Sequence, residues 1–511
     1  MARNGQKLFS KAEWSWILYD WANSIYATNI MAAIFPTIFV SIAGEAGDIW
    51  WGYGTSIATF LVAILAPLLG AVADYKGMKK KLFTAFMLIG VVFTFLIALV
   101  MNNWKLMLVG YIISHIGFSG SCLFYDSFLT DVTTDDRMDK VSSWGYAMGY
   151  IGGSTIPFVI SIAMLLILGY SNPIAQKFSI LIVSVWWLVF SIPFLKNVNQ
   201  VHYIERTPDT SIKQVFRNIA RTAKDLVQRR GLFLFVIAYF FYIDGVGTII
   251  SISTAYGTVL GLGTVGMILA LLVTQIVAMP CSILFANLAA KITARRALIG
   301  AIIVYTCICV VGFYMGYSLE PHQDAWEAAI GEHYAPAVKA SMPEEDGQAR
   351  LYTELSGALL DGLKEGKSLP EIAAQEKWAG LPEESRAALL KAAEDLAAGQ
   401  ADILNGFRGA IRLSTILFWC MAALVGTVQG GIQAVSRSYF GKLIPKERSN
   451  EFFGFFDIFG KFASVMGPFL YSLISGWTGR SSFGVLALIL LFLVGLFIMV
   501  LGKKDLEALE R

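Results

Sequence analysis

Two acidic residues stand inside stretches of the chain that are otherwise apolar. Asp20 lies in WSWILYDWANSIYATNIMAAIF, and Asp244 lies in FYIDGVGTIIS. A carboxylate at the centre of a bilayer costs about 2.5–3.5 kcal/mol on insertion scales, so intramembrane acids generally face a cavity or a partner and are functional candidates. We expect Asp20 and Asp244 to bind and release protons, or to hold a substrate ammonium. The alternative is that each acid is structural and bonded to polar neighbours such as Asn23.

Four further ionisable residues lie in or beside apolar stretches. Asp457 and Lys461 are four residues apart and share one face of a helix. This spacing predicts a mutually neutralising pair, and the sharper alternative is that Lys461 holds a substrate carboxylate. Asp126 is either part of an inner gate or an acid at the membrane interface. His115 is the one histidine within an apolar stretch and is either a packed hydrogen-bonding residue or a proton relay.

Aromatic and small residues surround these candidates. The aromatic side chains are expected to wall a cavity, with interface anchoring or plain packing as the alternatives. They are Tyr19, Trp21, Tyr26, Trp144 and Tyr242. One stretch also carries glycines at helical spacing, a pattern that favours close packing of two membrane helices. These glycines are Gly145, Gly149, Gly152 and Gly153.

The composition indicates an integral membrane protein. The chain has 511 residues, of which 56% are hydrophobic and 15% are charged, whereas soluble domains carry about 25% charged residues. The net charge of +3 is too small to indicate nucleic-acid binding. The five cysteines lie in apolar stretches without zinc-ligand spacing, so we predict no metal site, no disulfide and no cofactor. We also expect no cleavable signal peptide.

Catalytic signatures are missing from the sequence. GLGTVG at 261–266 fits a dinucleotide-binding pattern, but it lies in a turn between two apolar stretches and not after a strand, so we reject that function. The sequence has no Walker loop, no HExxH and no nucleophile elbow. We therefore predict neither an enzyme nor an ATP-driven pump.

Twelve stretches are long and apolar enough to cross a membrane. They run over about 15–42, 51–73, 82–101, 105–125, 142–169, 177–195, 231–256, 264–288, 297–317, 409–433, 452–475 and 483–502. If the N-terminus is cytoplasmic, the inside segments hold 27 Lys and Arg residues and the short outside loops hold 3. Because positive loops stay in the cytoplasm, we predict that both termini are cytoplasmic.

Two segments outside these stretches have distinct compositions. Residues 196–230 contain a basic amphipathic helix that suits an anionic membrane surface, with a solvated linker as the alternative. Residues 318–405 carry 17 acids and 7 bases. Their Ala, Glu and Leu content predicts three or four short helices that form a small extracytoplasmic domain.

An internal repeat links the two halves of the chain. Residues 127–158 align with residues 438–469 at an offset of 311. The matched positions include Arg137 with Arg448, and Pro157 with Pro468. Parallel repeats of this kind are typical of transporters in which two bundles rock about a central site. We therefore divide the chain into a six-helix bundle, a linker, and a second bundle interrupted by an insertion. The boundaries are 1–195, 196–230, 231–317, 318–405 and 406–511.

Several motifs resemble a known transporter family. The loop GAVADYKGMKKK at 70–81 resembles the inner loop between the second and third spans of the major facilitator superfamily. Its matching residues are Gly70, Asp74, Gly77, Lys79 and Lys80, with Met78 where an arginine is usual. YDWANS, SSWGYAMGYIGG, FFYIDGV and AVSRSYFGKLIPKERSNEFFGFFDIFGK resemble the branch related to the fungal vacuolar amino-acid effluxers of autophagy. In the similar motif SFLTD, Thr130 and Asp131 replace a usual proline and glutamate. The resemblance covers the membrane portion but not the insertion.

This resemblance implies an all-helical membrane protein with the major facilitator fold, in which spans one, four, seven and ten line a central cavity. It implies a secondary transporter of a small polar solute, with amino acids or peptide-like metabolites as the expected cargo and protons as the expected coupling ion. Inner-loop charges are then gate or topology residues; they are Asp74, Arg137, Arg437 and Arg448. The implied location is the inner membrane of a bacterium.

Two alternative functions remain open. The same fold could export or flip an amphipathic molecule, such as a drug or a lysolipid. A different class is a receptor or assembly protein that has lost transport and binds a protein partner through residues 318–405.

Overall fold

The structure is a computed structural model that describes residues 8–44, 47–205, 212–343, 345–373, 378 and 380–509. Over these residues it contains helices and one isolated β-bridge, between Tyr75 and Ile204. Twelve helical segments are long and apolar enough to span a membrane. The predicted all-helical class with twelve spans is therefore confirmed.

The first bundle begins with a capped helix. Ser10 accepts a hydrogen bond from the Glu13 backbone N–H at 3.1 Å, and the Glu13 carboxylate accepts from the Ser10 N–H at 2.7 Å. This reciprocal pair satisfies two N–H groups that would otherwise lack partners at the helix start. The helices of the bundle are α1 (Lys11–Ile25), η1 (Tyr26–Ala32), α2 (Ile34–Ala43), α3 (Gly47–Ala73), α4 (Met78–Leu99), α5 (Trp104–Ser127), α6 (Leu129–Val132), α7 (Asp135–Met148), η3 (Gly149–Thr155), α8 (Ile156–Leu168) and α9 (Pro173–Asn197). The η1 and η3 segments are π-helical.

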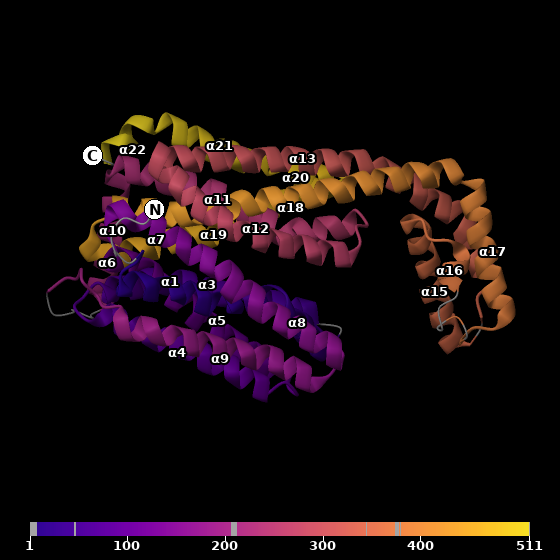
Figure 1. Cartoon of the computed structure of the whole chain (residues 1–511), viewed down its shortest axis with the longest axis horizontal. Coiled ribbons are helices and arrows are strands. Elements are labelled where there is room, and N and C mark those ends of the chain that lie inside the picture. Colours follow the sequence, from indigo (N-terminus) through magenta and orange to yellow (C-terminus); the bar gives the residue numbers. More distant parts are fainter. Residues whose placement is uncertain are drawn as a thin grey trace.

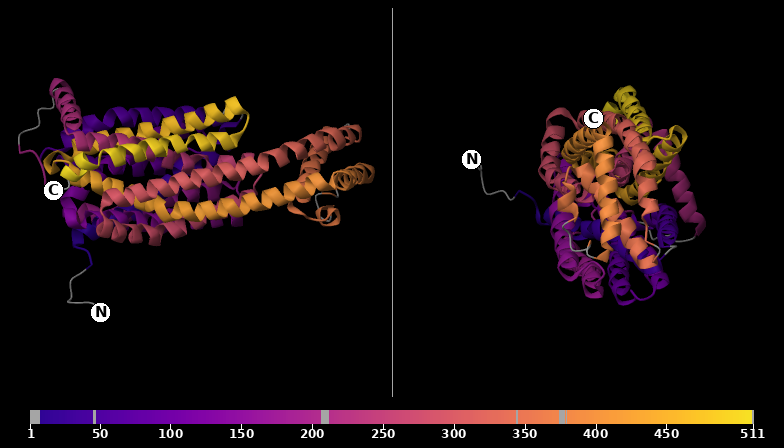
Figure 2. Two further views of the ribbon diagram at one scale, coloured as in Figure 1. Left: turned by 90° about the horizontal axis from the view of Figure 1, so that it is seen from above. Right: turned by 90° about the vertical axis from the view of Figure 1, so that its right-hand side faces the viewer.

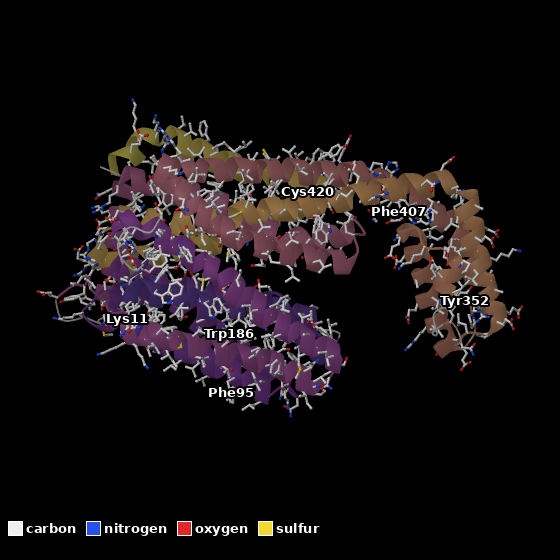
Figure 3. The ribbon with its side chains drawn as sticks, viewed as in Figure 1. Lys11, Phe95, Trp186, Tyr352, Phe407 and Cys420 are labelled. Atoms are coloured by element: carbon white, nitrogen blue, oxygen red, sulfur yellow. The ribbon has the colours of Figure 1, made fainter. Side chains whose placement is uncertain are left out.

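The second bundle repeats this plan. Its helices are α11 (Arg230–Val259), α12 (Thr264–Ile292), α13 (Ala294–Ala329), α18 (Ala401–Leu443), α19 (Ser449–Thr478), α20 (Ser481–Ala487) and α21 (Ile489–Leu501), followed by α22 (Lys503–Leu509). Large apolar side chains such as Phe95 and Leu493 are exposed on the outer faces of the bundles, as expected for surfaces that meet lipid (Figure 3). The predicted pair of six-span halves is present.

The linker forms the predicted helix, α10 (Ile212–Gln228). It packs against α3, α11 and α19, so it bridges the two bundles. Leu226 is buried and Val227 is exposed. The side chains of Ile212, Val215, Phe216 and Ile219 lie outside the described residues.

The two bundles meet at one end of the molecule and diverge toward the other (Figure 1). Both chain termini lie at the end where the bundles meet, which we call the terminal end. Here α3 packs against α19, and α7 packs against α12 and α18. The opposite end carries the insertion, and we call it the insertion end.

The insertion is carried on two long helices. Helices α13 and α18 continue past the expected boundaries at 317 and 406 and project beyond the other helices (Figure 2). Between them lie η4 (Ile330–Tyr334), α14 (Ala335–Ala340), α15 (Asp346–Glu365), α16 (Leu369–Ala373) and α17 (Glu383–Gly399). Fully buried Trp326, Tyr352, Leu359 and Leu389 give this region a core of its own. Arg480, in the turn before α20, pairs with Asp324 at 3.2 Å near the base.

Candidate functional site

Arg437 on α18 connects the two bundles. Its Nη1 donates to Asp126 Oδ1 on α5 at 2.9 Å, and its Nη2 lies 3.4 Å from Asp20 Oδ2 on α1. Its Nε donates to the Ser142 hydroxyl on α7 at 3.0 Å. The guanidinium therefore joins three helices of the first bundle to α18, and only 3% of Arg437 is exposed.

Aromatic rings enclose this guanidinium. Its central carbon lies 4.7 Å from the centre of the Trp16 ring, 4.5 Å from that of Tyr146 and 5.4 Å from that of Tyr125. The Tyr125 hydroxyl donates to Asp20 Oδ2 at 2.7 Å. Cation–π contacts are worth about 0.5–1 kcal/mol at exposed sites and about 2 kcal/mol or more when desolvated. The cluster is therefore held by charge, hydrogen bonds and ring faces together.

A second charged pair lies on α19. Lys461 and Asp457 form the ion pair that their spacing predicts. Asp457 lines a small cavity together with Ile116, Ser119 and Leu123 of α5. His115 exchanges a hydrogen bond with the Tyr111 hydroxyl at 3.2 Å. Helix α19 thus directs its charged pair toward α5 of the first bundle.

Helices α5 and α19 pack against each other, and we define Asp20, Asp126, Arg437, Asp457 and Lys461 together as the acidic cluster. Three of its members are acids and two are bases. With every group in its ordinary charge state, the cluster would carry one uncompensated negative charge. The side chains of Asp126 and Asp457 are partly exposed, so a further cation that offsets this charge could reach them from solvent.

Asp244 lies apart from the acidic cluster. Its Oδ1 accepts the Gly467 backbone N–H on α19 at 3.0 Å, and no described residue reaches its Oδ2. Asp244 is fully buried inside the second bundle. Tyr242, two residues earlier, is also fully buried and shares a hydrogen bond with Ser436 at 2.6 Å. The structure does not bring Asp20 and Asp244 together.

Tyr19 and Asn23 face the interior of the first bundle. The Tyr19 hydroxyl donates to Ser121 at 2.9 Å and accepts from Trp187 at 3.2 Å, and its ring is fully buried. The Asn23 Nδ2 is buried and has no hydrogen-bond partner among the described residues. Tyr19 therefore packs between helices of one bundle and does not contact the second bundle through these bonds.

The loop after α3 closes onto the start of α19. Asp74 accepts hydrogen bonds from the backbone N–H groups of Asn450 at 2.9 Å and Glu451 at 3.0 Å. Carboxylates are favoured at helix N-termini because the unpaired N–H groups point toward them. Lys79 donates to Asp131 at 2.7 Å and to Ser449 at 2.9 Å, so it also crosses between the bundles.

The glycines and Lys80 of this loop have different surroundings. Gly70 approaches the backbone of Asn450 so closely that a Cβ atom would collide with it. Gly77 has φ +72°, a conformation that favours glycine. Lys80 is bound to Asn199 at 2.9 Å near the surface of the first bundle. Only Gly70, of these three, lies at the contact between the bundles.

Pairs of repeat-equivalent residues meet across the contact. Arg437 and Asp126 are 311 positions apart, which is the repeat offset, and so are Lys446 and Asp135, whose charged groups are 3.0 Å apart. Opposite charges at equivalent positions therefore face each other near the axis that relates the bundles. We call these pairs, together with the contacts of Asp74 and Lys79, the seam.

Arg137 and Arg448 occupy equivalent positions in the repeat, and each forms ion pairs with different acids. Arg137 binds Glu13 within the first bundle at 2.8 Å. Arg448 binds Asp225 on α10 at 2.6 Å and Glu451 at 2.8 Å. Arg448 thus ties the linker to the seam.

Sequence reasoning missed several of these residues. It did not select the rings around Arg437, nor Lys442, which pairs with Asp139 at 2.6 Å across the bundles. The repeat offset would have indicated the pair of Asp135 and Lys446. Among the residues that the structure describes, no three His, Cys, Asp or Glu side chains come together as a metal site.

Comparisons with known proteins agree with this architecture. The family model described as "Vacuole effluxer Atg22 like" matches residues 50–330 and 414–505, and so leaves out most of the insertion. An uncharacterized MFS-type transporter of Bacillus subtilis, YxiO, is 38% identical over 98% of this chain and 96% of its own length. Autophagy-related protein 22 of Yarrowia lipolytica is 24% identical over 73% of this chain and 52% of its own length.

Solved structures show the same fold. A bacterial homologue of the iron transporter ferroportin, in an outward-facing state, aligns with a TM-score of 0.54 at 12% identity over 97% of this chain and 98% of that chain. The fucose:proton symporter of E. coli aligns with a TM-score of 0.55 at 12% identity over 96% and 97% of the two chains. The chain therefore belongs to the family of vacuole effluxer Atg22-like proteins, and it is an integral membrane protein with the major facilitator transporter fold.

Proposed function

We propose that this protein is a secondary active transporter that moves a small polar solute, an amino acid or a peptide-like metabolite, with coupling to protons. The observation that carries the proposal is the acidic cluster, in which three buried or half-buried acids are matched by two bases. A proton or a substrate ammonium would supply the missing positive charge.

The same cluster suits both ends of a zwitterion. Asp126 and Asp457 offer carboxylates to an ammonium group, and Lys461 offers an ammonium to a carboxylate. Lys461 is better placed for this task than Arg437, whose guanidinium is already committed to Asp20, Asp126 and Ser142. Cargo that enters between the bundles would compete with Asp457 for Lys461.

The seam suggests how the two bundles could give alternating access to the solute. In this structure the bundles are joined at the terminal end, where Arg437, Lys79 and Lys446 cross from one bundle to the other. For the solute to pass toward the terminal end, these contacts must break while the two bundles approach each other at the insertion end. With the Lys- and Arg-rich terminal end in the cytoplasm, the bundles of this state are joined on the cytoplasmic side and diverge toward the outside.

Transport into proteoliposomes tests the proposal. Purified protein would be reconstituted with an internal pH dye, and each standard amino acid would be added under an imposed proton gradient. We expect at least one amino acid to enter together with protons. Asp457→Asn should abolish proton coupling, whereas Glu384→Gln, at an exposed site in the insertion, should leave it unchanged. Uptake that does not depend on the gradient in either protein would contradict proton coupling.

A further inference from the structure

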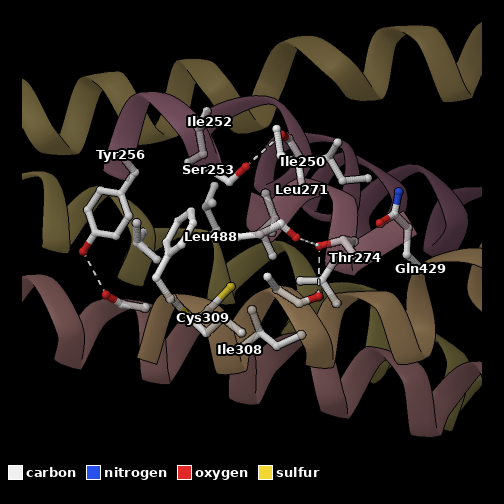
Figure 4. Close-up of a pocket in the computed structure, with 18 of the residues that line it drawn as sticks. Ile250, Ile252, Ser253, Tyr256, Leu271, Thr274, Ile308, Cys309, Gln429 and Leu488 are labelled. Atoms are coloured by element: carbon white, nitrogen blue, oxygen red, sulfur yellow. Dashed lines mark hydrogen bonds between the residues drawn. The ribbon is translucent and has the colours of Figure 1, made fainter. Parts of the chain in front are cut away.

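A partly open apolar cavity lies in the second bundle, away from the acidic cluster. It has a volume of about 110 Å³ and is lined by residues of α11, α12, α13, α18 and α20 (Figure 4). Its walls are mostly aliphatic and aromatic. They include Ile249, Ile252, Leu271, Phe418, Met421 and Leu488. None of the lining residues is charged, so the space does not suit an ion.

Most polar groups on the wall already have partners. The hydroxyls of Ser253, Tyr256 and Thr274 all donate to main-chain carbonyls, at 2.8–3.1 Å (Figure 4). Gln275 and Gln429 are different, because the Oε1 atom of each is buried and has no hydrogen-bond partner among the described residues. Gln429 is only 7% exposed, so water does not replace the missing donor from the surface.

Unpaired buried acceptors are unusual enough to require an explanation. In folded proteins the large majority of buried polar side-chain atoms have a partner, and an exception can mark a site that a ligand completes. Two carboxamides from neighbouring helices, α12 and α18, line one cavity and both lack a donor. A ligand with an N–H or O–H group at its polar end would satisfy one or both.

We propose that this cavity binds a small, neutral, amphipathic molecule, whose apolar part is about the size of a benzene ring and whose polar end donates a hydrogen bond to Gln275 or Gln429. Apolar protein cavities of about 150 Å³ bind benzene, so the volume here suits a group of that size or slightly smaller. This site shares no residue with the acidic cluster, and it goes beyond the proposed function. Its failure would leave the transport proposal unaffected.

Fluorine NMR on the full chain in lipid nanodiscs tests the site. The probe is 4-fluorobenzyl alcohol, and its control is 1-ethyl-4-fluorobenzene, which has the same shape but no donor. After subtraction of empty nanodiscs, we expect saturable line broadening by the alcohol and at least tenfold weaker binding of the control. Equal binding of both molecules, or binding of neither, would overturn the proposal.

Three variants distinguish binding in this cavity from nonspecific effects of a substitution. Gln275→Leu with Gln429→Leu removes both acceptors and should weaken binding of the alcohol at least tenfold. Ala422→Leu keeps both amides but fills the cavity, and it should also abolish binding. Gln433→Leu lies one turn further along α18, outside the lining, and should bind like the parent protein.

The same variants also test whether a lipid chain occupies the cavity instead. Size-exclusion profiles and thermal unfolding would confirm that each variant is folded, and Ala422→Leu provides an independent test if the glutamine variant is not. A phospholipid that co-purifies with the parent protein but not with Ala422→Leu would assign the cavity to a lipid chain. That result would overturn the proposal.

Discussion

The Arg437 guanidinium serves two carboxylates at once, Asp20 on α1 and Asp126 on α5. A lysine could not do the same, because only the planar fork of arginine presents several N–H donors in fixed directions. The rings of Trp16 and Tyr146 lie against the guanidinium and exclude water from it. The free energy of the seam should therefore depend strongly on this one side chain.

Substitution of Arg437 tests that dependence. Arg437→Gln leaves two acids without a base, and removal of one partner from a buried ion pair typically costs about 3–5 kcal/mol. We expect the joined state to become a minor population. Electron–electron distances between spin labels at exposed Asp136 and Asn287 would measure the separation of the bundles at the terminal end. Arg412→Gln, on an exposed part of the same helix, is the control and should leave the distances unchanged.

A compensating substitution sharpens this test. Asp126→Asn removes one of the two acids that Arg437→Gln leaves unpaired. The double variant should therefore recover part of the joined population. A double variant no better than Arg437→Gln alone would show that the guanidinium acts through its ring contacts and not through the acids.

Asp74 gives the seam a dependence on pH. Burial raises the pKa of Asp74 to about 7, in spite of the nearby Lys79 charge and the bonds from Glu451 and Asn450. When the seam opens, the carboxyl reaches water and its pKa falls toward the usual value of about 4. The joined state therefore binds a proton that the open state releases, and it is favoured as the pH falls from about 7 toward 4.

The same spin labels would measure this effect. Lowering the pH from about 8 to about 6 should increase the short-distance population, and Asp74→Asn should remove the part of the change that is centred near pH 7. A parent protein whose distances are independent of pH over this range would contradict the role of Asp74.

The sequence indicated many of these residues but not their partners. Asp20 and Asp126 were selected because they lie in or beside an apolar stretch, and Arg437 was selected as an inner-loop charge. Their mutual contact depends on how two bundles dock, and residue spacing along the chain carries no information on docking. Asp244 shows the same limit: Asp20 and Asp244 were expected to have the same role, whereas the structure packs Asp244 against α19 within the second bundle, apart from Asp20.

Among the helices, α1 and the α7–η3 segment approach each other most closely at glycines. A Cβ atom on Gly152 would overlap the Trp21 ring, and one on Gly145 would touch the Asp20 carboxylate. The predicted small-residue face is therefore confirmed. Glycine is required at these positions because aromatic and acidic side chains of α1 occupy the space that a larger side chain would need.

An added methyl group at this contact should destabilise the first bundle. Gly152→Ala forces Trp21 to move, and overpacking of this kind typically costs about 1–3 kcal/mol. Gly247→Ala on α11 is a matched control, because nothing lies within 4 Å of its added Cβ and alanine favours a helix. Thermal unfolding in detergent should separate the two variants. Equal midpoints would show that η3 yields freely to the larger residue.

The order of the helices was predictable, because a long apolar stretch that crosses a bilayer must satisfy its own backbone hydrogen bonds and does so as a helix. The π-helical turns η1 and η3 were not predictable, because they add one residue per turn without a change in composition. They lie beside each other in the first bundle. Single π-helical turns occur frequently at functional sites.

At the scale of the molecule, the insertion and the bundles are separable. The insertion has a buried core, and the ties at its base, Glu320 to Ser482 and Arg480 to Asp324, lie outside residues 331–400. The family model also matches the chain on both sides of this region. The twelve spans should therefore fold without it.

Deletion of residues 331–400, with a short Gly-Ser linker in their place, tests this separation. We expect a monodisperse membrane protein whose thermal midpoint changes by no more than about 4 °C, roughly 1 kcal/mol or less for a large protein. The deletion would remove the hydrogen bond from Arg408 to Leu363, as well as the packing of α15 and α17 against α18. Aggregation of the deleted protein would mean that the insertion is needed to align α13 with α18.

The orientation of the molecule decides which conformation the structure represents. Lys and Arg are concentrated at the terminal end, and this asymmetry favours a cytoplasmic terminal end. In a variant whose native cysteines are replaced by serine, a membrane-impermeant maleimide should label Glu384→Cys in intact cells and should label Lys504→Cys only after permeabilisation. The reverse pattern would contradict the charge argument. It would also invert the direction of access, because the bundles diverge toward the insertion end, and that end would then face the cytoplasm.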